Sequence, residues 1–214
     1  MKKSIMHKPA QKTIISDDIS CMNTFTNDDQ PLTIVAVLDK GWKGTKTFSL
    51  NLKNKNKNVN FFIIIIAKNS EEFSFNTEVI HEAPNTKSHY YIRSILLDNS
   101  KVTYKGLLSI KKTAKSSESY LSHHSLLLSQ NAKVETIPSL EIEANDASAG
   151  HSASMGKIDD EMMFYLLSRG IDEKTSKDIL IKAFLEKDFD KIEDENAKKI
   201  LDEKIEKILK KTLK

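Results

Sequence analysis

Residues 138–171 read PSLEIEANDASAGHSASMGKIDDEMMFYLLSRGI, and the spacing of the apolar residues changes within this stretch. The first residues suit a strand, whereas after Ile158 the apolar positions recur about every three and a half residues, which indicates a helix. Asp159 and Asp160 are good N-cap and first-turn residues, and Gly170 provides a stop. The chain is therefore predicted to change from strands to helices at this point.

The residues after this change, 157–214, are predicted to form a C-terminal α-helical subdomain. Asp172 can cap a second helix, in which residues 179–184 place their apolar side chains on one stripe. A third helix is expected from about Glu195. The region holds 14 basic and 15 acidic residues, so its polar faces are dense in charge but balanced. We expect this subdomain to pack on the β-rich part.

The residues before the change, 31–156, are predicted to form a β-rich core. Short runs of β type are separated by turn clusters at intervals that are typical of all-β domains. Residues 61–66 are apolar without alternation, which indicates a strand covered on both faces. The pattern alone favours a sandwich or a barrel and does not distinguish a solenoid from them. The predicted strands are 33–38, 47–52, 59–66, 73–80, 90–97, 102–110, 120–128 and 134–142.

Residues 1–30 are polar and poor in large apolar side chains, so a flexible N-terminal segment is expected. No apolar run follows the lysines at its start, so it does not resemble a secretory signal. The longest apolar run, 61–67, is far shorter than the ~20 residues that cross a bilayer. The single cysteine, Cys21, excludes an internal disulfide. These features predict a cytoplasmic protein that has no membrane partner.

The charge balance argues against nucleic acid as a partner. The net charge is +3, from 33 basic and 30 acidic residues, and the only arginines, the residues best suited to read phosphates and bases, are Arg93 and Arg169. Residues 41–44 lack the spacing of a phosphate loop, so this chain is not expected to bind a nucleotide. Standard zinc, redox and serine-nucleophile motifs are absent too, which predicts a protein that is not an enzyme.

The histidines are the remaining candidates for metal ligands, although a histidine is more often structural or simply exposed. His151 is the strongest candidate, because the small residues of 147–153 leave room for a ligand or a partner. Cys21 lies in the polar lead and is left out of the candidate site. Nearby carboxylates such as Glu141 and Glu143 most simply form a solvated face of a strand.

Two further pairs of histidines give weaker signals. His123 and His124 are adjacent on a predicted strand and face opposite sides, so at most one of them can belong to a given site. His81 and His89 flank a predicted turn that contains Pro84, and both are expected at the surface.

The stretch 138–171 resembles the end of the core domain of the SufB/SufD family. It contains, in the family's order, a Pro-x-Leu-Glu-Ile strand, an acidic turn, a His followed by small residues, an Ile-Asp-Asp-Glu cap and a Phe-Tyr-Leu-x-Ser-Arg-Gly helix. Weaker likeness at 81–86 and 125–128 extends the resemblance over about residues 32–190. The resemblance implies a right-handed parallel β-helix, or solenoid, followed by a small helical domain.

The resemblance also implies a role in iron–sulfur cluster assembly by the SUF system. Members of the family form a complex of SufB, SufD and the ATPase SufC, in which SufB and SufD pair through their late strands and their C-terminal helices bind SufC. The partners expected here are thus a SufB-like subunit and a SufC-like ATPase. The residues expected to contact the ATPase are Asp159, Met162, Met163, Phe164, Tyr165, Leu166 and Arg169.

The assembly site of the family uses a SufB cysteine and glutamate together with a SufD histidine. Alignment on Pro138 places that histidine at His151, whereas the SufB glutamate falls on Ser152 and the SufB cysteine on His123. The chain therefore resembles SufD, with His151 as a ligand to iron or an iron–sulfur cluster shared with the partner. A role for His123 as a second ligand is a further hypothesis. The thiolate or sulfide ligands would come from outside this chain.

Two alternatives from other classes stay open at this point. A β-helical carbohydrate-active enzyme needs clustered carboxylates on one face of the solenoid, and this sequence shows no clear acid pair. A purely structural homodimer would pair through its late strands, and the mass of the isolated chain would distinguish it from a heteromeric scaffold.

Overall fold

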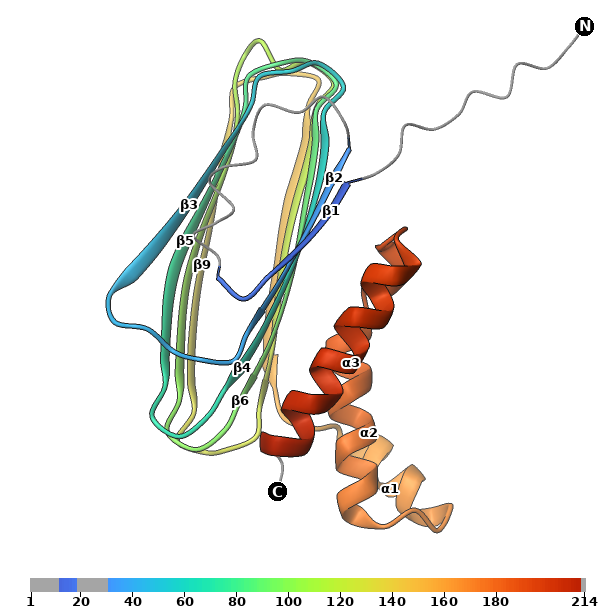
Figure 1. The fold of residues 1–214 in the computed structure, drawn as a ribbon. Coiled ribbons are helices and arrows are strands. Elements are labelled where there is room, and N and C mark those ends of the chain that lie inside the picture. The colour runs from blue at the N-terminus through green and yellow to red at the C-terminus, as the bar shows by residue number, and fades with distance from the viewer. Residues whose placement is uncertain (1–11, 19–30, 213–214) are drawn as a thin grey trace, which may run out of the picture.

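The computed structural model describes residues 12–18 and 31–212. Within these residues, the strands form two sheets whose pairs are all parallel, in the orders β1-β2-β4-β6-β8-β10 and β3-β5-β7-β9, and from β2 on successive strands alternate between the sheets. The chain winds as a β-solenoid of about four turns, with helices beside the larger sheet (Figure 1). The solenoid is confirmed, and the sandwich or barrel that the pattern alone favoured is wrong. Strand spacing could not reveal this, because it does not show which strands pair.

The strands have the following bounds: β1 Lys12–Ser16, β2 Leu32–Leu38, β3 Thr45–Leu52, β4 Asn58–Ala67, β5 Glu72–His81, β6 Lys87–Leu96, β7 Lys101–Ile110, β8 Glu118–Leu127, β9 Lys133–Ile142 and β10 Ser148–Gly156. Each strand of the solenoid pairs with a strand one turn away, so that Lys87 faces Glu118 across β6 and β8. Asn56 and Asn85 adopt left-handed φ values of 62° and 57° at equivalent turns, a conformation that asparagine tolerates.

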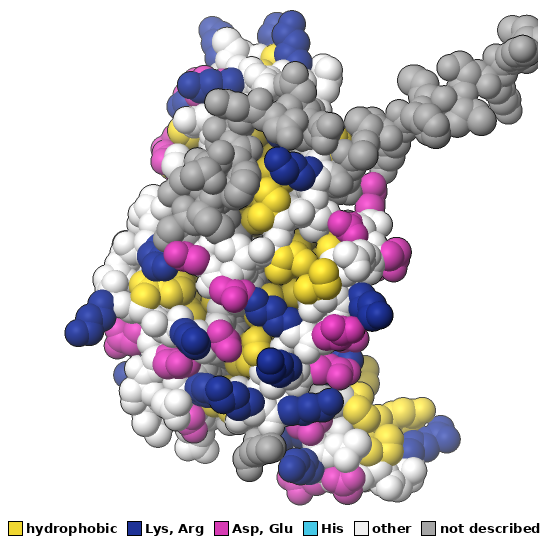
Figure 2. Space-filling model, in the orientation of Figure 1, with side chains coloured by type: hydrophobic (Ala, Val, Ile, Leu, Met, Phe, Trp, Pro, Cys, Tyr) yellow, Lys and Arg dark blue, Asp and Glu magenta, His cyan; other side chains and the backbone are white. Residues whose placement is uncertain are grey.

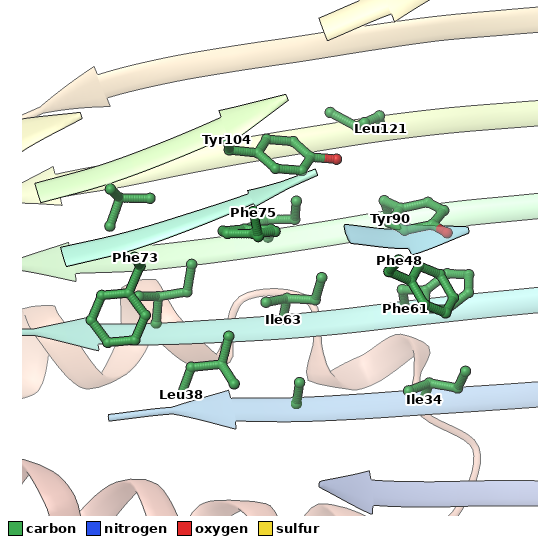
Figure 3. Packing of buried hydrophobic residues seen from close by; sticks show 14 of the residues in the cluster. Ile34, Leu38, Phe48, Phe61, Ile63, Phe73, Phe75, Tyr90, Tyr104 and Leu121 are labelled. Carbon is green, nitrogen blue, oxygen red and sulfur yellow. The ribbon is translucent and has the colours of Figure 1, made fainter. Parts of the chain in front are cut away.

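The main hydrophobic core lies between the two sheets, where aromatic rings stack from one turn to the next (Figure 3). The rings of Phe61 and Tyr90, which are paired residues of β4 and β6, have centroids 4.1 Å apart. Phe75 and Tyr104 repeat this arrangement in the opposite sheet at 4.8 Å. Because the strands are parallel and in register, like side chains fall into columns and bury a continuous core.

A second core lies on the outer face of the six-stranded sheet. There Phe62, Ile64 and Ile66 of β4 pack with the helices, whereas Phe61, Ile63 and Ile65 face the other sheet. This confirms that residues 61–66 form a strand covered on both faces.

The helices are α1 (Asp160–Ser168), α2 (Glu173–Glu186) and α3 (Glu195–Thr212), with a short 3-10 turn η2 (Phe189–Lys191) between α2 and α3. The expected caps are present: Asp159 Oδ1 accepts hydrogen bonds from the Glu161 and Met162 amides, and Asp172 Oδ1 accepts one from the Thr175 amide. Among the described residues, no helix combines the length and the apolar character that spanning a membrane requires.

Two strands were missed in the sequence. β1 lies within 1–30, where a flexible segment was expected, and pairs in parallel with β2. Its Ile14 packs on the core between the sheets and its Ile15 on the core under the helices, which is too short an apolar pattern to indicate a strand. β10 consists mostly of Ser, Ala and Gly and therefore lacks a hydrophobic signal. Residues 1–11 and 19–30, which include Cys21, lie outside the described residues.

Candidate functional site

The late end of the solenoid is open. β9 and β10 are the last strands of their sheets, and within the described residues neither has a strand on its outer edge. Such an edge presents backbone N–H and C=O groups that can pair with another chain. Large apolar side chains are exposed here as well, with Ile137 41%, Ile142 46% and Met155 56% accessible. This end, formed by β9 and β10, is called the open end below.

His151 lies on β10 at the open end, and its side chain is exposed. It is in register with Leu121 of β8, which is buried in the core between the sheets. Paired residues of a parallel sheet project to the same side, so the imidazole points to the inner side of the last turn, as Leu121 does in the turn before. It is exposed because the described residues contain no further turn that would cover it. Ala149 and Ala153 flank it on that side and add little bulk.

His123 is buried, with only 1% of the residue accessible, one strand away from His151 and offset by two register positions. Its Nε2 lies 2.8 Å from Ser94 Oγ and 3.1 Å from Ser125 Oγ, and its Nδ1 lies 2.8 Å from Thr136 Oγ1. Burial, with smaller contributions from His124 and Arg93, lowers the pKa of His123 to about 3. The ring is therefore a neutral hydrogen-bonding group of the interior, and its proposed ligand role requires these bonds to break.

The other described histidines have hydrogen-bond partners of their own. His124 faces the outer side of the sheet, as expected from its adjacency to His123, and its Nδ1 lies 2.6 Å from Ser154 Oγ of β10. His81 was expected at the surface but is fully buried, where its ring nitrogens bond to Thr86 and Ser88. The stacking of turns in the solenoid encloses it, which a turn signal in the sequence does not reveal. His89 is half-buried and lies 3.3 Å from a Glu118 carboxylate oxygen.

Helix α1 has an exposed apolar surface (Figure 2). None of its nine residues, all of which are described, is buried. Phe164 is 72%, Met162 57% and Tyr165 53% accessible, which is unusual for large apolar side chains on one short helix. Leu167, at 41%, belongs to the same surface but was not among the predicted contact residues. We call these four residues of α1 the apolar surface of α1.

The remaining predicted contact residues have structural roles in or beside α1. Met163 and Leu166 are half-buried, and α1 contacts α2. Asp159 caps the helix, and the Arg169 guanidinium lies 5.2 Å from the centroid of the Tyr165 ring. The predicted set therefore divides into residues that shape α1 and residues that α1 presents to solvent.

Among residues 12–18 and 31–212, no group of three or more His, Cys, Asp or Glu side chains is arranged to hold a metal ion. Among the residues of β9 and β10, all of which are described, His151 is the one histidine, and it does not belong to a ready-made ligand cluster. A soft iron or iron–sulfur substrate held there would take its thiolate or sulfide ligands from elsewhere.

Comparisons with known proteins agree with this architecture. The family profile described as SUF system FeS cluster assembly, SufBD core domain, matches residues 30–184. An iron–sulfur cluster assembly SufBD family protein of Staphylococcus saprophyticus is 35% identical over 109 residues, which cover 51% of this chain and 23% of the relative. The iron–sulfur cluster assembly protein SufB of Bacillus subtilis is 32% identical over 123 residues, which cover 58% and 26%.

The chain thus spans about a quarter of the length of the curated relatives it matches. The match to the family profile nevertheless runs from β2 to α2 and includes both the open end and α1. Because this profile covers most of the chain, the chain belongs to the SufBD core-domain family of the SUF system for iron–sulfur cluster assembly.

Proposed function

We propose that this chain is a SufD-like, non-catalytic scaffold subunit that pairs with a SufB-like subunit through its open end and binds a SufC-like ATPase through α1. Iron or an iron–sulfur cluster is the cargo, held between the two solenoid chains. The observation that carries the proposal is the exposed imidazole of His151 on a strand whose outer edge has no partner within the described residues. Both features are needed for a ligand that is shared across an interface.

Three residues support the SufD type over the SufB type. The chain has His151, but Ser152 replaces the SufB glutamate and His123 replaces the SufB cysteine in the alignment on Pro138. The similarity to a relative named SufB does not decide the type, because the resemblance covers the core domain that both types share. A SufB-like partner would supply the thiolate that this site lacks.

The apolar surface of α1 supports a docking role. Leaving Phe164 and Tyr165 in water forgoes the hydrophobic stabilisation that burial would give, so a partner that covers them gains affinity. The sequence has no phosphate loop, which fits an assembly in which a second protein hydrolyses ATP. Membership of the SufBD family also favours this assembly role over a carbohydrate-active enzyme.

The experiment is to co-purify the chain with SufB-like and SufC-like proteins and to measure iron and sulfide per complex. We expect His151→Ala to lower the loading while the complex stays intact, because one ligand is lost. His89→Ala is the matched control, since His89 is a half-buried histidine of the same sheet on β6, away from the open end. Unchanged loading in His151→Ala would rule out the ligand role.

A homodimer is the second candidate, and the open end offers a specific reason for it. The outward side chains of β9 run Lys133, Glu135, Ile137, Ser139, Glu141. Antiparallel pairing of two copies about Ile137 would set each Lys133 opposite Glu141 of the other copy and the two Ile137 side chains against each other. Opposite charges therefore meet at both ends of the paired strands.

The same axis suits β10. Thr136 Oγ1 of β9 bonds to His123 of β8, and His123 is in register with Ala153 of β10. Residues 136 and 153 therefore lie at the same height along the strands of the two sheets, and so do Ile137 and Ser152. Pairing of two β10 strands about Ser152 would then place Met155 against the small Ala149 of the other copy.

Sedimentation of the isolated chain tests the homodimer. Lys133→Glu should convert a dimer into a monomer, and Lys133→Glu combined with Glu141→Lys should restore the dimer. A chain that is monomeric alone and pairs only in the mixture with the SufB-like protein would favour the first candidate.

A further inference from the structure

The solenoid and the helices are joined by a buried ion pair as well as by apolar packing. Arg93 projects from β6 on the outer face of the six-stranded sheet, and Asp188 follows the end of α2. Their accessible fractions are 6% and 7%. Arg93 Nε and Nη2 lie 3.0 and 2.7 Å from Asp188 Oδ2, so the guanidinium donates two hydrogen bonds to one carboxylate oxygen.

Two contacts between a cation and an aromatic ring lie beside this ion pair, and both cross from the solenoid to the helical part. The guanidinium of Arg93 lies 5.2 Å from the centroid of the Phe184 ring on α2. In return, Lys191 Nζ of η2 bonds to the other oxygen of Asp188 and lies 4.9 Å from the ring centroid of Tyr91 on β6. The solenoid and the helical part each contribute one cation and one aromatic ring, so two directional contacts cross the same junction.

The apolar part of the junction has a different character. Side chains such as Ile181 and Leu185 of α2 and Ile205 of α3 pack on the sheet, and this burial provides the stabilisation. Hydrophobic contact depends on the area removed from water and not on direction. A buried ion pair has the opposite properties: desolvation offsets most of its attraction, whereas its hydrogen-bond geometry permits one arrangement.

The pair lies far from α1, so a small change in the geometry of the pair would produce a larger displacement of α1. Asp188 lies at the end of α2 that is remote from the α1–α2 connection, and an α-helix of this length spans about 20 Å. A small rotation at the junction would therefore be amplified at α1. On the solenoid, Arg93 is in register with His124, whose Nδ1 lies 2.6 Å from Ser154 Oγ of β10. The same row of residues thus reaches the strand that carries His151.

We propose that Arg93 and Asp188 are positioning residues that fix the orientation of α1 relative to the open end, while the apolar junction supplies the stability. The pair determines how the apolar surface of α1 is oriented relative to a chain bound at the open end. This inference goes beyond the proposed function, because it concerns the chain alone and its test needs no partner.

The test measures the orientation of α1 relative to the solenoid and the thermal stability of the chain in the same variants. Spin labels are placed at Lys105→Cys on β7 and Ser168→Cys on α1, both exposed positions, in a Cys21→Ser background, and their distance distribution is measured by pulsed electron paramagnetic resonance. The parent is expected to give one narrow distribution. Arg93→Met combined with Asp188→Leu replaces the pair by apolar side chains, and we expect the distribution to broaden while Tm changes by less than about 4 °C.

Two further variants sharpen the result. Arg93→Lys keeps the charge but not the planar fork, so it should broaden the distribution less than the apolar pair does. The control replaces the exposed ion pair of Lys111 and Glu143 by Met and Leu and should leave the distribution unchanged. An unchanged distribution in the Met/Leu variant of Arg93 and Asp188 would overturn the proposal. Failure of that variant to fold would also overturn it, because the pair would then be needed for stability.

Discussion

Strands β2 and β10 belong to the same six-stranded sheet, yet all seven residues of β2 are buried and none of the nine residues of β10, all described, is. Both are parallel strands of similar length, so strand conformation does not explain the difference. β2 has a strand on each side and helices over its outer face, whereas β10 pairs with β8 on one side. The comparison shows that the neighbouring strands and helices, and not strand conformation, determine whether a strand of this sheet is buried. The end that lacks such neighbours is where another chain is expected to bind.

The largest loss of stability should come from a cavity-forming substitution in the covered region. Phe61→Ala removes a fully buried ring that stacks on Tyr90 and contacts Phe48 edge to face, so we expect the free energy of unfolding to fall by about 3–5 kcal/mol. Met155→Ala at the open end is the matched control and should change it by less than about 0.5 kcal/mol, because Met155 is already exposed. Urea unfolding measures both, and equal losses would contradict the comparison.

A loss of stability of intermediate size should come from lowering the pH. Burial lowers the pKa of His81 to about 4 and that of His123 to about 3, from an ordinary value of 6.5. As the pH falls below 6.5, the unfolded chain binds protons that the folded chain does not, so stability decreases until the folded-state pKa is reached. We expect a loss of about 1 kcal/mol per pH unit for each histidine between pH 6 and 4.

Unfolding measured across this pH range checks the assignment of the slope to the buried rings. His123→Gln should flatten the pH dependence, whereas Met155→Gln, at an exposed position without a titrating side chain, should leave it unchanged. Identical slopes in the parent and in His123→Gln would show that another group causes the acid sensitivity.

The smallest effect on stability should come from the apolar surface of α1. Phe164→Ser combined with Tyr165→Ser should change the free energy of unfolding by less than about 0.5 kcal/mol, because both side chains are mostly in water. The same variant should weaken binding of a SufC-like ATPase, as measured by calorimetry. Ile200→Ser, at an exposed apolar position of α3, is the control and should bind as the parent does. Normal binding by the α1 variant would place the docking surface elsewhere.

Sequence patterns predicted much of the local structure. The strand at 61–66 was identified as covered on both faces because apolar residues occupy both sides of it, and the helix caps at Asp159 and Asp172 were identified from their side-chain chemistry. The same reasoning missed β10, since serine, alanine and glycine carry no hydrophobic period. It also misplaced His81, because a turn that is exposed in a hairpin is enclosed when turns of a solenoid stack above and below it.

The candidate site shows a similar division. His151 and the apolar residues of α1 could be named from a motif, because residue type and order are local properties. The motif could not reveal that His123 is held by three hydroxyl groups, two of them from other strands, or that Arg93 meets Asp188 across a separation of 95 residues. Those contacts depend on the winding of the chain.

The sequence by itself determined where the helices and most strands form and to which family the open-end motif points, because propensity, periodicity and motif order act over a few neighbouring residues. Only the tertiary structure decided which strands pair, which histidines are buried, and which end of the solenoid stays open. Those outcomes follow from stacking turns about 30 residues apart, and no local pattern carries information over that separation.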